Sequence, residues 1–324
     1  MTTFKEIRGT AVRSLSSDPS NPETGQLWYN NSIGVLKGYQ LAAAAWSAGG
    51  NMGTTRRTLG NAGTQTEALG FGGYTGTGTI YVTATEEYNG STWTAGGNMA
   101  TARDTLEGAG TQTAALGFGG YDTAPSNATE EYDGSSWTGG GNLGTARYFL
   151  AGCGTQTAGL AFGGRLTSGG ASVVNTEEYN GSTWTGGGNL GTAKRNLAGA
   201  GIQTAGLAFG GFATTISNVT EEYDGSAWSA GGNLNTARQA LGGAGTQTAG
   251  LAFGGNGPTG ATEEYNGTSW TVSTTMTTAR NYLAGCGTQT AGLAFGGLTT
   301  VLTAATEEYS GAALAVKTIT TSTS

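Results

Sequence analysis

The sequence contains no histidine among its 324 residues. Histidine is the most frequent general base in enzymes and the most frequent metal ligand in proteins. Its absence excludes a Ser-His-Asp triad and any metal centre that depends on imidazole. We therefore expect no metal, no cofactor and no histidine-based catalysis.

Basic residues and long apolar runs are also lacking. Lysine and arginine together number only 14, and the net charge is −7. We therefore expect no nucleic-acid partner and no attraction to anionic lipid. No apolar run approaches the ~20 residues that span a bilayer. Residues 1–8 lack the apolar core of a signal peptide. These features predict a soluble protein without membrane insertion that is not exported by the general secretory route.

Proline is scarce, with 4 residues, whereas glycine is abundant, with 62. Collagen is excluded because the glycines follow no three-residue period. The 13 tyrosines, 9 phenylalanines and 7 tryptophans recur at fixed spacings, which argues against disorder. The composition indicates an all-β protein in which neighbouring backbones approach closely.

Six repeats follow one another between residues 46 and 314. Each contains a Gly-Thr-Gln-Thr-like turn, a Phe-Gly-Gly triplet and a Thr-Glu-Glu-Tyr motif. The segment between the last two motifs has 11, 8, 11, 8, 6 and 8 residues in successive repeats, and the remaining frame always has 36. All length variation therefore falls in one loop. The repeats begin at Trp46, Trp93, Trp137, Trp184, Trp228 and Trp270.

Each repeat is interpreted as four short strands. In the second, we expect strands at Arg103–Gly110, Ala114–Gly119 and Thr129–Tyr132, with Trp137 opening the fourth. The Asp133-Gly134 pair and its equivalents predict two-residue type I′ turns. Four strands in ~40–50 residues, repeated in tandem, are typical of a propeller blade.

A Gly-Gly doublet, a tyrosine, a tryptophan five residues later and a basic residue opening the next unit together resemble the kelch repeat. The resemblance covers residues 46–310 and implies a six-bladed kelch-type β-propeller, which we place at residues 46–314. The last repeat ends in Leu314 instead of tryptophan, and Trp46 has no blade before it. We therefore expect the Trp46 strand to close the last blade beside Thr306–Tyr309, with a tail at 315–324 outside the ring.

Cys153 and Cys286 occupy the same position in the third and sixth repeats, on opposite sides of a six-fold ring. This separation predicts two buried free thiols instead of a disulfide.

One basic residue opens each first strand. Two interpretations remain open: a cationic ring that binds an anionic sugar or a partner, and ion pairs with a strand-three glutamate such as Glu86 or Glu87 that hold neighbouring blades together. Presence in every repeat favours the structural interpretation, since a ligand site usually breaks symmetry. The residues are Arg56, Arg103, Arg147, Lys194, Arg238 and Arg280.

The variable loops are the candidate recognition surface, because a rigid scaffold commonly carries its binding residues on loops. They contain Tyr74, Tyr81, Tyr121, Arg165 and Phe212, which could contact a glycan or a protein and share a face with the basic residues. Neutral variation of exposed loops is the alternative. The loops are Tyr74–Ala84, Tyr121–Ala128, Arg165–Asn175, Phe212–Val219, Asn256–Ala261 and Leu298–Ala305.

The repeated glutamates could supply the carboxylate pair of a glycoside hydrolase. Their equal copies argue against one catalytic pair, and we expect no carboxylate that is unique to one blade centre. The chain is therefore predicted not to be an enzyme.

Residues 1–45 lie outside the repeats. Residues 16–22 form a turn-rich linker, and two apolar runs flank Asn30–Gly34, which predicts a β-hairpin. The segment Gly25–Asn30 with Gly34–Tyr39 resembles a segment of virion and tail-fibre proteins of tailed phages, marine ones especially. This resemblance implies an anchor, for which Trp28, Tyr29, Leu36 and Tyr39 are the candidates.

We therefore expect a structural virion protein assembled in the host cytoplasm. A tail-fibre or adhesin role in binding a host glycan or receptor is preferred over a capsid decoration or tail-tip role. Residues 1–45 would contact other virion proteins and would mediate any homo-oligomer. The alternatives are a cytosolic kelch interaction scaffold and an enzyme that cleaves surface polysaccharide.

Overall fold

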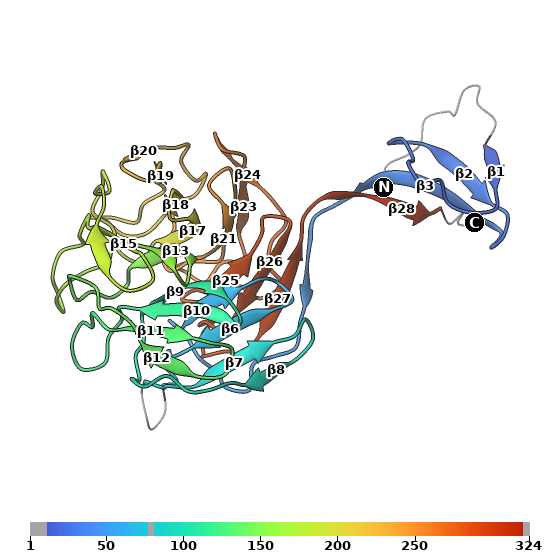
Figure 1. Cartoon of the computed structure of the whole chain (residues 1–324). Coiled ribbons are helices and arrows are strands. Elements are labelled where there is room, and N and C mark those ends of the chain that lie inside the picture. The colour runs from blue at the N-terminus through green and yellow to red at the C-terminus, as the bar shows by residue number, and fades with distance from the viewer. Residues whose placement is uncertain (1–11, 77–80, 320–324) are drawn as a thin grey trace. The chain divides into compact units, whose positions relative to one another are not determined.

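The computed structural model describes residues 12–76 and 81–319, in which every regular element is a β-strand. The chain divides into two compact units, one formed by residues 45–310 and the other by residues 1–44 together with 311–324. The strands make seven four-stranded sheets (Figure 1). Six of these sheets belong to the larger unit.

The sheets of the larger unit repeat one antiparallel order. The first contains β5 (Gly60–Gly63), β6 (Ala68–Phe71), β7 (Thr85–Tyr88) and β8 (Trp93–Ala95). The next four contain β9 (Glu107–Thr111), β10 (Ala114–Phe118), β11 (Thr129–Tyr132), β12 (Trp137–Gly139); β13 (Ala151–Thr155), β14 (Ala158–Phe162), β15 (Thr176–Tyr179), β16 (Trp184–Gly186); β17 (Ala198–Ile202), β18 (Ala205–Phe209), β19 (Thr220–Tyr223), β20 (Trp228–Ala230); and β21 (Gly242–Thr246), β22 (Ala249–Phe253), β23 (Thr262–Tyr265), β24 (Trp270–Val272).

The sixth sheet combines strands from the two ends of the unit. It contains β25 (Ala284–Gly287), β26 (Ala291–Phe295), β27 (Thr306–Ser310) and β4 (Ala45–Ala48). Tyr309 lies opposite Trp46 in antiparallel register. The expectation that the Trp46 strand completes the last repeat is confirmed.

A closed cycle of backbone hydrogen bonds connects the six sheets just before their first strands. The amide two residues after each basic residue donates to the carbonyl of its equivalent in the neighbouring sheet. The bonds run from Thr105 to Thr58, Phe149 to Thr105, Asn196 to Phe149, Ala240 to Asn196, Tyr282 to Ala240 and Thr58 to Tyr282, at 2.8–3.1 Å. These residues have φ of 51–54°, a left-handed conformation that costs about 1 kcal/mol each without glycine and that the cycle helps to hold.

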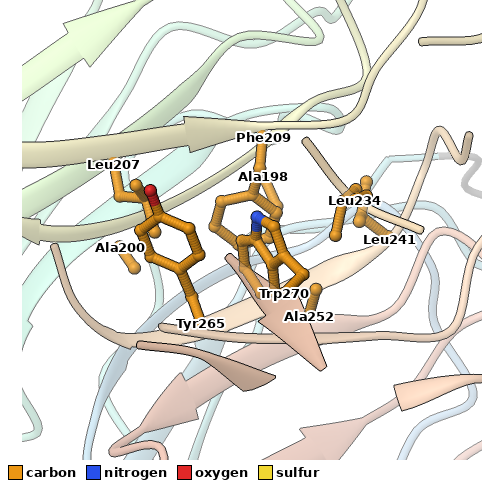
Figure 2. Close-up of a cluster of buried hydrophobic side chains, with 9 residues drawn as sticks. All are labelled: Ala198, Ala200, Leu207, Phe209, Leu234, Leu241, Ala252, Tyr265 and Trp270. Carbon is orange, nitrogen blue, oxygen red and sulfur yellow. The ribbon is translucent and has the colours of Figure 1, made fainter. Parts of the chain in front are cut away.

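Aromatic side chains form the core between neighbouring sheets. Figure 2 shows Phe209 of β18 beside Trp270 of β24, with ring centroids 4.9 Å apart, and Tyr265 against the same tryptophan. The indole Nε1 of Trp270 also donates to Thr220 Oγ1 at 3.0 Å, across the same interface. Each outer tryptophan packs in this way on a phenylalanine of the preceding sheet, which explains why both residues recur.

The repeated glutamine forms a second contact between sheets. Gln112 Nε2 donates to the carbonyls of Ala68 and Tyr88 in the preceding sheet, at 2.9 and 2.6 Å. These carbonyls would otherwise be partly buried without a partner, which costs about 1–3 kcal/mol. The same pair of bonds is made by Gln65, Gln156, Gln203, Gln247 and Gln289.

Two local predictions are wrong. The first strand of the second sheet begins at Glu107 instead of Arg103, which lies in the preceding link. Tyr132 pairs with Trp137, so the turn has four residues instead of two. Asp133 Oδ1 accepts from the amides of Ser135 and Ser136, both at 2.8 Å, and this side-chain bonding stabilises the longer turn.

The smaller unit is one sheet of β1 (Arg13–Leu15), β2 (Leu27–Asn30), β3 (Val35–Ala42) and β28 (Ala313–Thr318). The predicted hairpin is confirmed as β2 and β3. Residues 315–318, predicted as part of a separate tail, pair with β3, where Val316 lies opposite Tyr39. In Figure 1 the red β28 runs beside the blue β3. Segments near both ends of the sequence therefore build this sheet together.

Candidate functional site

The six basic residues predicted as a binding ring are buried in ion pairs. Arg103 is fully buried, with its Nη2 2.8 Å from Glu130 Oε1 and its Nη1 bonded to the carbonyls of Gly119 and Ala128. The ligand-binding interpretation is wrong for these residues because solvent does not reach them. The predicted pairing with a strand-three glutamate is confirmed, but the prediction that these pairs hold neighbouring blades together is wrong, because each pair joins groups of one sheet. The pairs are Arg56–Glu86, Arg103–Glu130, Arg147–Glu177, Lys194–Glu221, Arg238–Glu263 and Arg280–Glu307, at 2.8–3.1 Å.

These ion pairs lie within a sheet, whereas the second glutamate of each motif connects neighbouring sheets. Tyr132 Oη of the second sheet donates to Glu87 Oε1 of the first at 2.5 Å. Burial and this bond raise the pKa of Tyr132 to about 12. The repeated glutamates are therefore explained by structure.

Tyrosines of the variable loops come together on one face. The ring of Tyr81 lies 6.2 Å from those of both Tyr74 and Tyr121, and Tyr121 lies 5.0 Å from Tyr148. The series continues through Phe149 to Tyr282, with centroids 5.1 and 6.4 Å apart. All except Tyr148 are partly exposed. The loop-face prediction therefore identified three members of a larger cluster.

Arginines lie over these rings. The guanidinium of Arg57 is 4.7 Å from the Tyr74 ring centroid and 5.6 Å from that of Tyr282. Arg165 lies over Tyr148 at 5.3 Å, and Arg195 lies over Phe212 at 4.3 Å. We call this surface the aromatic–arginine face; it comprises Tyr74, Tyr81, Tyr121, Tyr148, Phe149, Phe212 and Tyr282 with Arg57, Arg165 and Arg195.

The sequence-based prediction missed Arg57, Tyr148, Phe149, Arg195 and Tyr282. All five occupy the one or two positions that follow the repeated basic residue. The signal is present in the sequence, because these two positions differ between most repeats, whereas the basic residue before them and the leucine after them recur or are conservatively replaced. Loop length does not reveal it.

An acidic group also faces this surface. Asp104 accepts weak bonds from the hydroxyls of Thr58 and Thr105, both at 3.3 Å. Burial raises the pKa of Asp104 to about 6, although those hydroxyls and Arg57 act in the opposite direction. Asp104 is therefore mostly ionised at neutral pH and becomes protonated as the pH falls below about 6.

The first strands surround a cavity of about 190 Å³. Glu107 of β9 lines it, and its Oε1 accepts from the Gly108 amide at 3.0 Å and from Asn61 Nδ2 at 3.3 Å. The expectation that no carboxylate is unique to one blade centre is wrong, because the other repeats have glycine or alanine at this position. Burial raises the pKa of Glu107 to about 8.

Both cysteines are buried free thiols, as predicted. Both also line this cavity. Burial raises the pKa of Cys286 to about 12 and that of Cys153 further. Both thiols are therefore protonated at neutral pH.

The anchor candidates of the smaller unit differ in exposure. Trp28 is fully buried and its Nε1 donates to Asp18 Oδ1 at 3.0 Å, so its role is in the core of the unit and not at a contact surface. Tyr29 is 42% exposed, and Leu36 and Tyr39 are partly buried. Bonds from Lys37, Asn30 and Trp28 lower the pKa of Asp18 to about 2.

No protein-family model matches the sequence, and no curated protein matches it. Among solved structures, the chain is similar to one titled "Structure of YjhT", with a TM-score of 0.67 at 12% identity, over 85% of this chain and 100% of that one. A likeness at this identity shows the fold alone. The fold is a β-propeller.

The described residues contain no helix long and apolar enough to cross a membrane. Within the same part of the chain, no group of three or more acidic, cysteine or histidine side chains is placed to hold a metal ion.

Proposed function

We propose that this chain is a structural, non-enzymatic protein of a tailed-phage virion, and that its propeller is a six-bladed kelch-type ring that serves as a tail-fibre or adhesin component. The six equivalent sheets and the cycle of six backbone hydrogen bonds support that number of blades. The Gly-Gly, tyrosine, tryptophan and basic positions support the kelch type.

The attachment role rests on the positions at which the repeats differ from one another. Buried positions such as the ion pairs and the tryptophans are nearly invariant, whereas exposed tyrosines and arginines that break the symmetry gather on the aromatic–arginine face. Partly exposed aromatic rings and guanidinium groups supply stacking and hydrogen bonding at binding surfaces. The face is thus suited to binding a host glycan or receptor.

The smaller unit supports attachment to the particle. Several apolar side chains are exposed on it, including Tyr29, Ile33, Leu41 and Leu314, at 42–63%. Exposed apolar groups gathered on one small sheet are typical of a surface that is covered by a partner. We assign to this unit the contact with other virion proteins.

The proposal includes no catalytic role. Among the described residues that line the cavity, Glu107 is the one carboxylate, and glycoside hydrolysis uses two. Glu107 also bonds its own neighbouring amide instead of a second acid.

Immunoelectron microscopy of purified phage particles from the source tests the proposal, with matched host lysate as the control. Label at the tail or fibres is the expected result. Label over the head would instead make this a capsid decoration protein. Label in the lysate and on no particle would contradict a virion role and favour a cytosolic kelch scaffold.

A further inference from the structure

We propose that Arg165 and Arg195 form a binding site for the acidic group of a saccharide, so that the attachment surface recognises an anionic host polysaccharide. This inference rests on the proposed function and adds the chemical class of the ligand. It follows from how the few basic residues of the propeller are distributed.

Residues 45–310 contain nine lysines and arginines in a chain that is acidic overall. Six of them are buried in the ion pairs within the sheets. The other three are Arg57, Arg165 and Arg195, and all three belong to the aromatic–arginine face. Every propeller cation that is not used in a structural ion pair therefore lies on the surface proposed to bind the host.

Arg165 and Arg195 come from neighbouring sheets, and both contact Ser172, Arg195 through its guanidinium and Arg165 through its backbone. Arg195 Nη1 donates to Ser172 Oγ at 3.1 Å, and Ser172 forms a backbone bridge with Arg165, whose Nε donates to the carbonyl of Thr167. Neither guanidinium makes an ion pair with a carboxylate of the described residues. Neither positive charge is therefore neutralised by a carboxylate of the described residues.

The charges of the two arginines also act on each other. The pKa of Arg195 is lowered mainly by burial and next by the charge of Arg165. A bound oxyanion would relieve this repulsion and accept hydrogen bonds from both guanidiniums, which is the arrangement arginine favours for carboxylate and sulfate groups.

Aromatic rings fix the two arginines and continue the surface. Tyr148 lies under Arg165 and Phe212 under Arg195, which orients both guanidinium planes. Tyr121 and Phe149, each about 5 Å from Tyr148 by ring centroid, are partly exposed and could stack on the sugar ring that carries the acidic group. Asp104 and Asp122 lie near Tyr81 and adjoin Tyr121, so their charges disfavour an acidic group there and favour one beside the two arginines.

The test measures binding of the full chain to three probes: an oligogalacturonate, its neutral methyl ester and a sulfated galactan oligosaccharide of equal length. The variants are Arg165→Gln with Arg195→Gln and, as a control of equal charge change, Arg13→Gln with Lys317→Gln in the smaller unit. Thermal melts establish that each variant is folded.

We expect at least one acidic probe to bind about tenfold more tightly than the neutral ester, with an affinity that falls as salt rises. The Arg165/Arg195 variant should lose that preference, whereas the control should keep it. Preference for the carboxylate over the sulfate, or the reverse, identifies the acidic group. Equal affinity for acidic and neutral probes, or an unchanged preference in the Arg165/Arg195 variant, would overturn the proposal.

Binding of the same proteins to host cells separates this inference from the proposed function. If wild type and the Arg165/Arg195 variant bind host cells equally well, the anion site is refuted and host attachment still stands. Wild type that binds acidic probes and no host cell would refute host attachment and leave the anion site standing.

Discussion

At the scale of single residues, the buried ion pairs depend on the shape of arginine. Arg103 bonds Glu130 through one terminal nitrogen and two backbone carbonyls through the other, so most of its buried charge is compensated. Lys194 has one nitrogen, which contacts Glu221 and, more distantly, the carbonyl of Val219. The lysine therefore makes fewer of the bonds that the fold offers at this position.

We expect Arg103→Ala to lower the free energy of unfolding by about 3–5 kcal/mol, because Glu130 would remain buried without a cation. Lys194→Arg should raise it by up to about 1 kcal/mol through one added hydrogen bond. Denaturant unfolding followed by tryptophan fluorescence measures both. A loss below about 1 kcal/mol for Arg103→Ala would contradict the assigned role.

Glu107 should make stability depend on pH. Its pKa is about 8 in the folded protein and ordinarily near 4.3 when unfolded, so the folded state binds more protons between those values. Stability contributed by this group is present below pH 4 and is lost as pH rises toward 8.

Glu107→Gln should therefore gain stability relative to wild type as pH rises, by at least about 1 kcal/mol between pH 5 and 8.5. Melting temperatures across this range provide the measurement, and Glu67→Gln in an exposed turn is the control. Parallel curves for wild type and Glu107→Gln would show that Glu107 titrates normally.

At the same scale, the sequence predicted the residues that repeat better than those that do not. Repetition identified ion pairs of the Arg103–Glu130 kind, because a charged residue that recurs in every blade is expected to have a structural role. Glu107 was missed although the aligned repeats show glycine or alanine at its position. That it lines a cavity follows only from the way six first strands surround one space.

At the scale of elements, β4 completes the sixth sheet by pairing with β27. Trp46 lies 5.2 Å from the Phe253 ring and 5.0 Å from that of Tyr309, and its Nε1 donates to Thr262 Oγ1. These contacts connect the fifth and sixth sheets. Without β4, the backbone of β27 would have no partner on its outer edge.

A fragment of residues 45–310 should fold with a melting temperature close to that of the full chain, since β1, β2, β3 and β28 make a separate sheet. A fragment of residues 49–310, shorter by β4, should melt at least about 10 °C lower because it loses a buried tryptophan, worth about 3–5 kcal/mol, together with a strand. Calorimetry compares the two. Equal melting temperatures would show that β4 does not stabilise the ring.

Strand order was predictable and turn geometry was not. Aligned repeats gave the third and fourth strands of the second sheet correctly at Thr129 and Trp137. The Asp-Gly pair indicated a two-residue turn. Instead, the Asp133 carboxylate accepts hydrogen bonds from the amides of Ser135 and Ser136, which stabilises a turn of four residues. Such competition between side chain and backbone is decided by geometry that a dipeptide pattern does not contain.

At the scale of the whole molecule, tyrosine–glutamate bonds connect neighbouring sheets around the ring. The pKa values of Tyr88, Tyr132, Tyr179, Tyr223 and Tyr265 are raised to about 12 by burial and by the acceptor glutamate. A tyrosine has a pKa near 10 when unfolded. Because the pKa of each of these tyrosines is higher in the folded protein than in the unfolded chain, the tyrosines stabilise the folded state below pH 10. That stabilisation is lost as pH rises toward 12.

Alkaline unfolding should consequently be cooperative between pH 10 and 12. The buried tyrosines should ionise together with the loss of tryptophan fluorescence, after the exposed tyrosines have titrated near pH 10. Absorbance near 295 nm and fluorescence followed in one titration test this. Ionisation of every tyrosine near pH 10 with the fold intact would contradict the buried interfaces.

The aromatic–arginine face could be predicted only in part at this scale. Loop variation predicted Tyr74, Tyr81 and Tyr121, and these rings do lie together. Tyr148 and Tyr282 are three repeats and more than a hundred residues apart in the sequence, and Phe149 contacts the rings of both. Closure of the ring brings them to one surface, which no local pattern shows.

The central claim is that this surface attaches the protein to the host. The most direct test is competition, in which purified full chain is added before phage adsorb to host cells. Wild type should block adsorption, Tyr121→Ala with Tyr282→Ala should need at least about tenfold more protein, and Tyr29→Ala in the smaller unit should behave as wild type. Equal blocking by the Tyr121/Tyr282 variant and wild type, or no blocking by wild type, would contradict the claim.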